Sequence, residues 1–470
     1  MTATILSPPR RGTSPRTVPV WVAIAAASLP MFMATLDNLV LTSALPVIDA
    51  DLHATVTEPS WFMNAFTLTF ASLMLTAASL GDRLGRRRVM IAGIAVFTLA
   101  SIASALATTP TALIAARAVQ GVGAAAIMPL SLTLLASAVP ERLRSVAIGI
   151  WSGISGLGVA LGPVIGGAVV EGISWQAIFW LNVPVAILSI PLLRFAIRES
   201  TAGRPRLDPV GTLLLGGAVF LGIWGIVHGN DHGWTAPSVL GPLVGAGLLV
   251  PGYLLWARRR ADAVLPLRLF ASRSFSAANA IGLLFTLGMF GAVFLLAQYL
   301  QVVMGYSPLE AGIRTLPWTA APMLFAPLAG VLARRVGVRP LLLVGLAAQT
   351  AALAWFAALT EGHAAYSSFV VPLLLAGAGM GFTFAPSATA VLDGLPDSDF
   401  AVASSANSTL REFGVAIGIA VLVAVFLANG GAITPTGYDG AVGPALLTGA
   451  AAVGAAAIAA LFIPGRRVAV

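Results

Sequence analysis

The chain has 470 residues, of which 58% are hydrophobic and only 9% are charged, and its formal net charge is +8 at pH 7. Soluble domains carry about 25% charged residues. So few charges over so long a chain exclude a water-soluble globular protein and predict an all-α polytopic membrane protein. The absence of cysteine excludes disulfides, thiol catalysis and cysteine metal sites.

Apolar segments of about 20 residues recur along the chain, which is the length of a membrane-crossing helix and about twice that of a barrel strand. They follow a polar, Pro-rich start, residues 1–17, that is predicted to be a cytoplasmic tail without a cleavable signal. The fourteen predicted spans are Val20–Ile48, Ser60–Leu80, Val89–Ala107, Thr111–Val139, Ser145–Val170, Gln176–Ile197, Pro209–Val227, Pro237–Ala257, Phe275–Met304, Gly312–Ala333, Pro340–Leu359, Tyr366–Leu392, Ser404–Ala428 and Gly443–Ile463.

The arginines test this count. If the N-terminus lies inside and the spans alternate, every arginine except Arg117, Arg314 and Arg411 falls on an inner segment. The outer segments hold acidic residues and all four histidines, whose scatter over three loops favours solvated loop residues over a metal site. The pattern predicts both termini in the cytoplasm and explains the positive charge better than nucleic-acid binding does. One inner loop, 393–400, is acidic instead.

Internal repeats relate the two halves of the chain. Three features recur at a nearly constant separation of about 250 residues: a charged loop with Gly85 and Gly337, the Gly121-Val122-Gly123 segment with its counterpart at Gly377, and a glycine pattern that begins at Gly158 and again at Gly414. Spans one to six therefore pair with spans nine to fourteen, and spans seven and eight are an insert. The predicted divisions are residues 1–17 (tail), 18–200 (six-helix bundle), 201–273 (inserted hairpin and linkers), 274–464 (six-helix bundle) and 465–470 (cytoplasmic tail).

Several polar or unusual residues lie inside apolar spans. Asp37 lies in span one and Arg117 in span four, where a guanidinium costs about 2.5–3.5 kcal/mol at the membrane centre unless it has a partner or a wet cavity. Span five carries Gly158, Gly162 and Gly166 at intervals of one helical turn, and Pro163 is expected to bend it.

These motifs resemble the major facilitator superfamily, in its fourteen-helix drug/proton antiporter branch. The loop pattern G-x-x-x-D-R-x-G-R-[KR] matches from Asp82 to Arg87, with Ala78 in place of the first glycine. The span-one pattern L-D-x-T-x-x-x-x-A-L-P matches Leu36 to Pro46, with Leu39 in place of threonine. The antiporter signature of span five matches Gly158, Gly162, Pro163, Gly166 and Gly167. The likeness extends over nearly the whole chain beyond residue 17.

The resemblance implies a role for each motif. The loop residues Asp82, Arg83, Gly85, Arg86 and Arg87 would latch the two bundles in one access state, although the arginines also suit simple anchoring on the inner side. Span five would form a hinge and seal between the bundles, with a plain packing stripe as the alternative.

The resemblance also implies that spans one and four line the cavity side by side. Helix geometry places Asp37 and Arg117 roughly 16 and 9 Å from the outer ends of their spans. We therefore expect them to pair when Asp37 is ionised and to carry a proton as the cavity becomes alternately wet and dry. A static ion pair is the alternative.

Span thirteen supplies Asn407, Arg411 and Glu412, and the family commonly has glutamine at the last of these positions. Two hypotheses remain open for Glu412. It carries a second proton or contacts a cationic substrate, or it neutralises Arg411 or an arginine of an adjacent inner loop.

The sequence thus predicts a proton-coupled exporter of small amphipathic or lipophilic compounds in the cytoplasmic membrane of a prokaryote. No nucleotide-binding loop is present, so ATP is not the fuel, and no clustered nucleophile, base or metal set indicates an enzyme. We expect a monomer among membrane lipids that needs protons but no cofactor. The alternatives are a dedicated transporter of one metabolite, self-made antibiotic or lipid, and a non-transporting receptor or scaffold.

Overall fold

The computed structural model describes residues 18–53, 58–201, 208–260, 263–361, 364–432, 434–438 and 440–465. The two predicted terminal tails, apart from residue 465, and the inner parts of the linkers around the insert lie outside these ranges. Throughout the described part of the chain the regular structure is helical, and no strand occurs. Thirteen of the described helical segments are long and apolar enough to cross a membrane, or fourteen when the bent fifth span is included. The predicted fold class is therefore confirmed.

The helices follow the predicted spans, with ends that differ by a few residues. The sixth span is divided into α6 and α7, and the tenth into α11 and α12. The elements are α1 (Val20–Leu52), α2 (Glu58–Leu84), α3 (Arg86–Ala105), α4 (Pro110–Ala138), α5 (Glu141–Gly172), α6 (Ala177–Trp180), α7 (Asn182–Ala196), α8 (Pro209–His232), α9 (Pro237–Ala257), η1 (Leu267–Ala271), α10 (Arg273–Val302), α11 (Pro308–Thr319), α12 (Pro322–Val336), α13 (Val338–Glu361), α14 (Tyr366–Leu392), η2 (Asp397–Asp399), α15 (Phe400–Ala428), η3 (Pro435–Tyr438) and α16 (Val442–Ala460).

Local sequence explains where several helices begin. Thr109 accepts a hydrogen bond from the backbone N–H of Ala112 at the start of α4, and Ser272 does the same for α10. At the start of α11, Ser307 and Glu310 form a reciprocal capping box. These caps satisfy backbone N–H groups that a helix end leaves without partners, which matters most near the apolar membrane interior.

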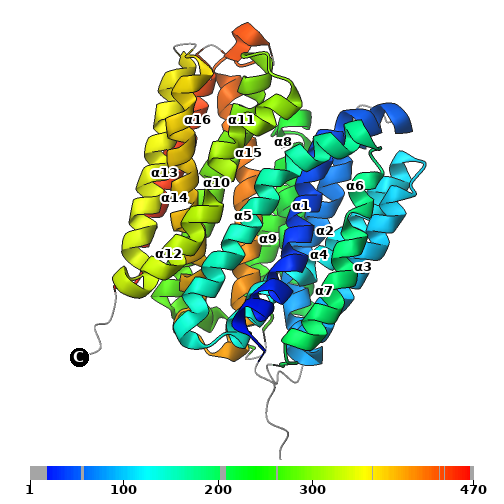
Figure 1. The fold of residues 1–470 in the computed structure, drawn as a ribbon, viewed down its shortest axis with the longest axis vertical. Helices are drawn as coiled ribbons and strands as arrows, with labels where there is room; N and C mark the ends of the chain where they lie inside the picture. Colours follow the sequence, from blue (N-terminus) through cyan, green and yellow to red (C-terminus); the bar gives the residue numbers. More distant parts are fainter. Residues whose placement is uncertain are drawn as a thin grey trace, which may run out of the picture.

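The two halves pack in the same way (Figure 1). The N-terminal bundle comprises α1–α7 and the C-terminal bundle α10–α16. In the first, α1 packs on α5 and α3 on α4; in the second, α10 packs on α15 and α13 on α14. The charged loops also correspond, since Gly85 and Gly337 both have a positive φ, 113° and 88°, which side chains other than glycine rarely adopt.

The bundles meet along two seams. In one, α5 packs against α12, and Figure 1 shows α5 running obliquely between the two bundles. In the other, α2 packs against α15. The equivalence of these seams is what a pseudo-twofold axis along the membrane normal requires.

The inserted hairpin packs beside the second seam. Its first helix, α8, contacts both α2 and α15, while α9 packs mainly on α8. Asp208 ties the base of the hairpin, because its carboxylate accepts hydrogen bonds from Gly211 N, Trp256 Nε1 and Val264 N. The exact boundaries of these divisions stay a prediction.

The first seam depends on small residues. A side chain at Gly149 of α5 would place its Cβ 2.7 Å from the carbonyl oxygen of Ala326, and one at Gly330 would place it 2.5 Å from the carbonyl oxygen of Ser145. Both distances are too short for a Cβ, so the backbones of α5 and α12 approach closely only because both positions are glycine.

We therefore expect Gly149→Val to destabilise the protein by about 1–3 kcal/mol, the usual cost of overpacking. Thermal unfolding in detergent is the measurement. Gly247→Val is the matched control, because a Cβ at this α9 position would have no other atom within 4 Å. Equal unfolding temperatures for the two variants would contradict the close-packed seam.

Candidate functional site

A buried ion pair lies inside the N-terminal bundle. Arg117 of α4 donates from Nη1 to Oδ2 of Asp37 on α1, with an N–O distance of 2.6 Å. Both residues are buried, and Arg117 has no exposed surface. The structure thus brings together the acid and the base that the sequence placed at similar membrane depths.

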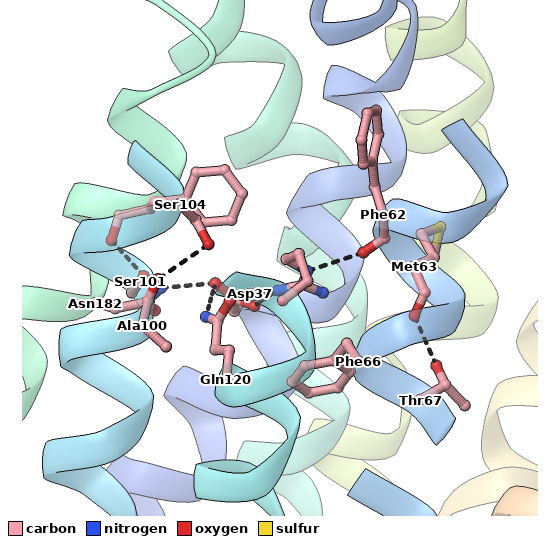
Figure 2. A network of polar contacts seen from close by, with 12 residues as sticks. Asp37, Phe62, Met63, Phe66, Thr67, Ala100, Ser101, Ser104, Gln120 and Asn182 are labelled. Atoms are coloured by element: carbon pink, nitrogen blue, oxygen red, sulfur yellow. Dashed lines mark hydrogen bonds and ion pairs between the residues drawn. The ribbon is translucent and has the colours of Figure 1, made fainter. Parts of the chain in front are cut away.

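Three further side chains complete the site around Asp37 (Figure 2). Gln120 Nε2 and Asn182 Nδ2 donate to Oδ1 of Asp37 at 2.9 and 2.6 Å. Gln120 Oε1 also accepts from Arg117, and Asn182 also donates to Ser101 Oγ. Gln120 and Asn182 lie in predicted spans, but no role was predicted for either of them. Their polarity inside apolar spans was the available signal.

Helix α2 supplies the other contacts of Arg117. Its Nε donates to the carbonyl oxygen of Phe62 at 3.0 Å, and its Cζ lies 4.5 Å from the ring centroid of Phe66. The Phe179 ring lies further away, at 6.0 Å. Nη2 is buried and has no hydrogen-bond partner among the described residues. Arg117 is therefore held firmly by contacts to α1, α2 and α4. Its hydrogen-bonding capacity is not fully used, because Nη2 has no described partner.

A cavity of about 130 Å³ lies where the bundles meet. Its wall is mainly apolar, with aromatic and methionine side chains from both halves. The lining residues are Met31, Ala34, Thr35, Asn38, Leu39, Phe66, Phe70, Ala124, Met128, Trp151, Ser152, Ser155, Gly156, Val159, Phe290, Met380, Phe384, Arg411, Glu412 and Val415. Among its polar atoms, Thr35 Oγ1, Asn38 Oδ1, Ser152 Oγ and Arg411 Nε are buried and lack a hydrogen-bond partner within the described residues.

The residues predicted in span thirteen lie on α15. Arg411 and Glu412 line the cavity, and the Arg411 guanidinium lies 4.3 Å from the ring centroid of Phe384. No ion pair within 4 Å joins Glu412 to an arginine of the described chain. Asn407 lies outside this cavity, where its amide donates to Asn279 Oδ1 at 3.3 Å and lines a much smaller void beside Arg411.

Asp37 is not part of the cavity wall, whereas its neighbour Asn38 is. Consecutive residues on a helix point about 100° apart, so α1 directs the acid into its own bundle and the amide towards the second bundle. The ion pair and the cavity are therefore adjacent but separate sites.

At the arginine-rich end of the molecule, the charged loop bridges the bundles. Arg86 Nε donates to Asp82 Oδ1 at 2.9 Å, and both residues are buried. Arg86 Nη2 donates to the carbonyl oxygens of Asp397 and Ser398, at 2.8 and 3.2 Å. These carbonyls belong to the loop that leads into α15, so Arg86 joins the two bundles directly.

The acidic loop 393–400, an exception in the arginine pattern, has arginine partners. Arg144 of α5 lies 3.8 Å from Asp397, and Arg268 donates to both carboxylate oxygens of Asp399 at 2.6 and 2.8 Å. The hydrogen bond to Asp399 raises the pKa of the Arg268 guanidinium. The acidic residues of this loop therefore form local ion pairs with arginines. They do not change the arginine distribution, from which the orientation is predicted.

The other predicted loop residues have different positions. Arg87 donates to the carbonyl oxygens of Arg194 and Ile197 within its own bundle, and its N–H binds Glu199. Arg83 is exposed. Among the described contacts, only Arg86 of these arginines reaches the second bundle.

The glycines of span five contact both bundles. A Cβ at Gly162 would lie 2.5 Å from Leu39 Cβ, and Gly158 also faces α1, so these glycines pack within the N-terminal bundle. Gly153 and Gly167 face the second bundle, at Pro327 and Leu309. Gly166 is buried.

The arms Glu141–Val159 and Val164–Gly172 meet at 42°, and the bend contains Gly162 and Pro163. The side chain of Pro163 lies outside the described part.

Two sequence comparisons extend this description. A sequence profile described as "Major Facilitator Superfamily" matches residues 27–419. The chain is 32% identical to the tetracenomycin C resistance and export protein of Streptomyces glaucescens, over 95% of this chain and 84% of that protein. It is 35% identical to the cephamycin export protein CmcT of Amycolatopsis lactamdurans, over 88% and 87% of the two chains.

A third relative is the multidrug efflux pump LfrA of Mycolicibacterium smegmatis, with 33% identity over 87% of this chain and 81% of that protein. Among solved structures, the proton:xylose symporter XylE superposes with a TM-score of 0.67 over 95% of this chain and 96% of that chain. At 13% identity, the likeness to XylE concerns the fold alone.

The ion pair gives a prediction that is independent of any substrate. Asp37→Leu should destabilise the protein by about 3–5 kcal/mol, because it leaves a buried guanidinium without its counter-charge. The double variant Asp37→Leu with Arg117→Leu should be less destabilised than Asp37→Leu alone. Thermal unfolding in detergent measures both, and additive losses in the double variant would contradict a coupled pair.

Proposed function

Since this chain belongs to the major facilitator superfamily, whose members are transporters and not enzymes, we propose that it is a proton-coupled antiporter. It exports small amphipathic or lipophilic compounds across the cytoplasmic membrane by alternating access, with both termini in the cytoplasm. The observation that carries the proposal is a largely apolar cavity between the bundles, beside a buried carboxylate–guanidinium pair.

The cavity wall supports this class of substrate. Phenylalanine, tryptophan and methionine side chains adapt to aromatic and aliphatic compounds of varied shape. The four buried polar atoms without partners offer hydrogen bonds to a bound compound, and binding would remove the cost of leaving them unsatisfied. An apolar wall with a few convergent polar groups is typical of small-molecule sites.

The relatives support export. Their names concern tetracenomycin C, a cephamycin and multiple drugs. By analogy, the substrates proposed here are antibiotics or drugs of similar amphipathic character.

We assign proton coupling to Asp37. Ionised, it is stabilised by Arg117, Gln120 and Asn182; protonated, it gives up its ion pair and releases the guanidinium for other contacts. A carboxyl whose arginine partner approaches and withdraws can bind and release a proton in each cycle. Glu412 is the acid of the cavity wall, and we assign it contact with a cationic substrate or a second proton, since no described ion pair within 4 Å joins it to Arg411.

Arg86 supports the alternating-access part of the proposal. In this structure it closes the arginine-rich end, which we assign to the cytoplasm, by binding carbonyl groups of the opposite bundle. Opening that end requires these hydrogen bonds to break. The close approach of α5 and α12 at Gly149 and Gly330 lies near the same end, because Gly330 packs on Ser145 at the start of α5, so opening would have to separate these helices as well.

A dedicated exporter of one antibiotic is the second candidate. Two of the relatives carry the name of a single compound or compound class. A panel of tetracenomycin C, methylenomycin A, a cephamycin and ethidium distinguishes the candidates. Uptake of several structurally unrelated compounds supports the broad exporter, and uptake of one supports the dedicated exporter.

The transport test uses inside-out membrane vesicles. An imposed proton gradient, acid inside, should drive accumulation of at least one panel compound, and Asp37→Asn should reduce it to the level of vesicles without the protein. Glu171→Gln, which removes an exposed acid, is the control. Normal accumulation by Asp37→Asn would refute the assigned proton site, and no gradient-driven accumulation by the unaltered protein would refute the antiporter.

The latch gives a separate prediction. Because the chain has no cysteine, Ser404→Cys creates a single reporter at a buried position of α15 that contacts Thr133 of α4 in the opposite bundle. Arg86→Gln should raise the alkylation rate of this cysteine by at least about tenfold, since the loss of even one hydrogen bond to a charged group costs about 1.5–3 kcal/mol.

Arg83→Gln is the control, because Arg83 is exposed and has no described contact with the second bundle. If the two arginine variants label at the same rate, Arg86 does not act as a latch.

A further inference from the structure

One aromatic side chain belongs to both the cavity and the ion-pair site. Phe66 lines the cavity, and its ring lies 4.5 Å from the guanidinium carbon of Arg117. We infer that Phe66 is the positioning residue through which a bound substrate acts on the Arg117–Asp37 pair. This inference rests on the proposed antiport function and assigns the link between its two sites.

The geometry favours Phe66 over the other cavity-lining residues as the link between a bound substrate and the ion pair. Its ring is buried, and Figure 2 shows Phe66 one turn along α2 from Phe62. Phe62 fixes Arg117 through its carbonyl oxygen, so α2 holds the arginine at two points. The carbonyl contact is part of the backbone, whereas the ring contact can change by rotation of one side chain.

A cation over an aromatic face is attracted more strongly in a desolvated site than at a surface. The Phe66 ring therefore stabilises the present position of the guanidinium. A compound that enters the cavity and displaces or clamps this ring changes that stabilisation without touching either charged residue. Arg117 also has an open donor, Nη2, with which it can respond.

The charged groups around Phe66 offer no other described contact through which a bound substrate could act on the ion pair. Arg117 and Asp37 lie on the bundle side, while Arg411 and Glu412 line the cavity. None of the described ion pairs or hydrogen bonds joins these two groups of charges. Phe66 contacts Arg117 of the first group and lines the same cavity as the second.

Phe70 is the natural comparison. It lies one turn further along α2, lines the same cavity and stacks on Phe66 with 5.5 Å between ring centroids. No cation–aromatic contact between Phe70 and Arg117 is present among the described residues. Loss of the Phe70 ring therefore changes the cavity wall and the packing of Phe66 but keeps the ring that contacts Arg117.

The experiment compares two rates in proteoliposomes that contain the full chain. The first is uptake driven by a proton gradient, and the second is downhill efflux at equal pH on both sides. The compound is the member of the panel above that the unaltered protein accumulates most strongly. Phe66→Leu should lower the ratio of driven to downhill transport by about tenfold, within the range of a desolvated cation–π contact. Phe70→Leu should lower both rates together, and Phe66→Tyr should keep the ratio because it keeps the ring.

An equal ratio in Phe66→Leu, Phe70→Leu and the unaltered protein would overturn the inference while leaving the antiporter intact. A lowered ratio in Phe66→Tyr as large as that in Phe66→Leu would also overturn it, since a phenol retains the aromatic face. If the unaltered protein shows downhill but no driven transport, the proposed proton coupling fails first and this inference falls with it.

Discussion

The buried pair of Arg117 and Asp37 is the constraint on which the N-terminal bundle depends. A lone guanidinium within the membrane costs several kcal/mol, and removal of one partner of a buried pair costs about as much again. Four helices meet this cost together: α1 supplies the carboxylate, α2 a carbonyl and an aromatic ring, α4 the arginine and Gln120, and α7 Asn182. Under the proposed alternating access, helices fixed in this way would move as one body.

The C-terminal bundle repeats the packing but not the charges. The position equivalent to Arg117 is Leu373, which is buried in the apolar core, and Asp82 is replaced by Arg334. The contacts between helices are nevertheless equivalent, and Gly337 retains the positive φ of Gly85. The two bundles therefore share a backbone plan but not their charges, since the first holds the buried Asp37–Arg117 pair and the second places Arg411 and Glu412 at the cavity.

The sequence predicts much of the fold because its signals are local. Hydropathy defines the spans, and the repeat indicates two bundles with an insert, while the direction that arginine placement gives the spans stays a prediction. The pair of Asp37 and Arg117 was predictable from depth together with a family resemblance. The partners of Asp82 and Arg86 were not, because Arg86 binds backbone carbonyls of Asp397 and Ser398, and any residue can supply a carbonyl. The contact of Phe66 with Arg117 could not be predicted either, since nothing in the sequence distinguishes this phenylalanine from the other 21 of the chain's 22.

The separation of Asp37 from the cavity constrains the mechanism. In the simplest exchanger, proton and substrate compete for one carboxylate, and coupling follows from that competition alone. Asn38, not Asp37, faces the cavity here, so a bound compound does not contact the acid in this state. In the proposed antiporter, Glu412 is the one acid among the described cavity-lining residues at which a cationic substrate could compete with a proton. For neutral compounds, coupling in the proposed antiporter would pass through groups that touch both sites, such as Phe66, or through the relative motion of the bundles that Arg86 would restrain. Indirect coupling of this kind places few chemical demands on the substrate, which suits a cavity whose wall is mostly hydrocarbon and aromatic.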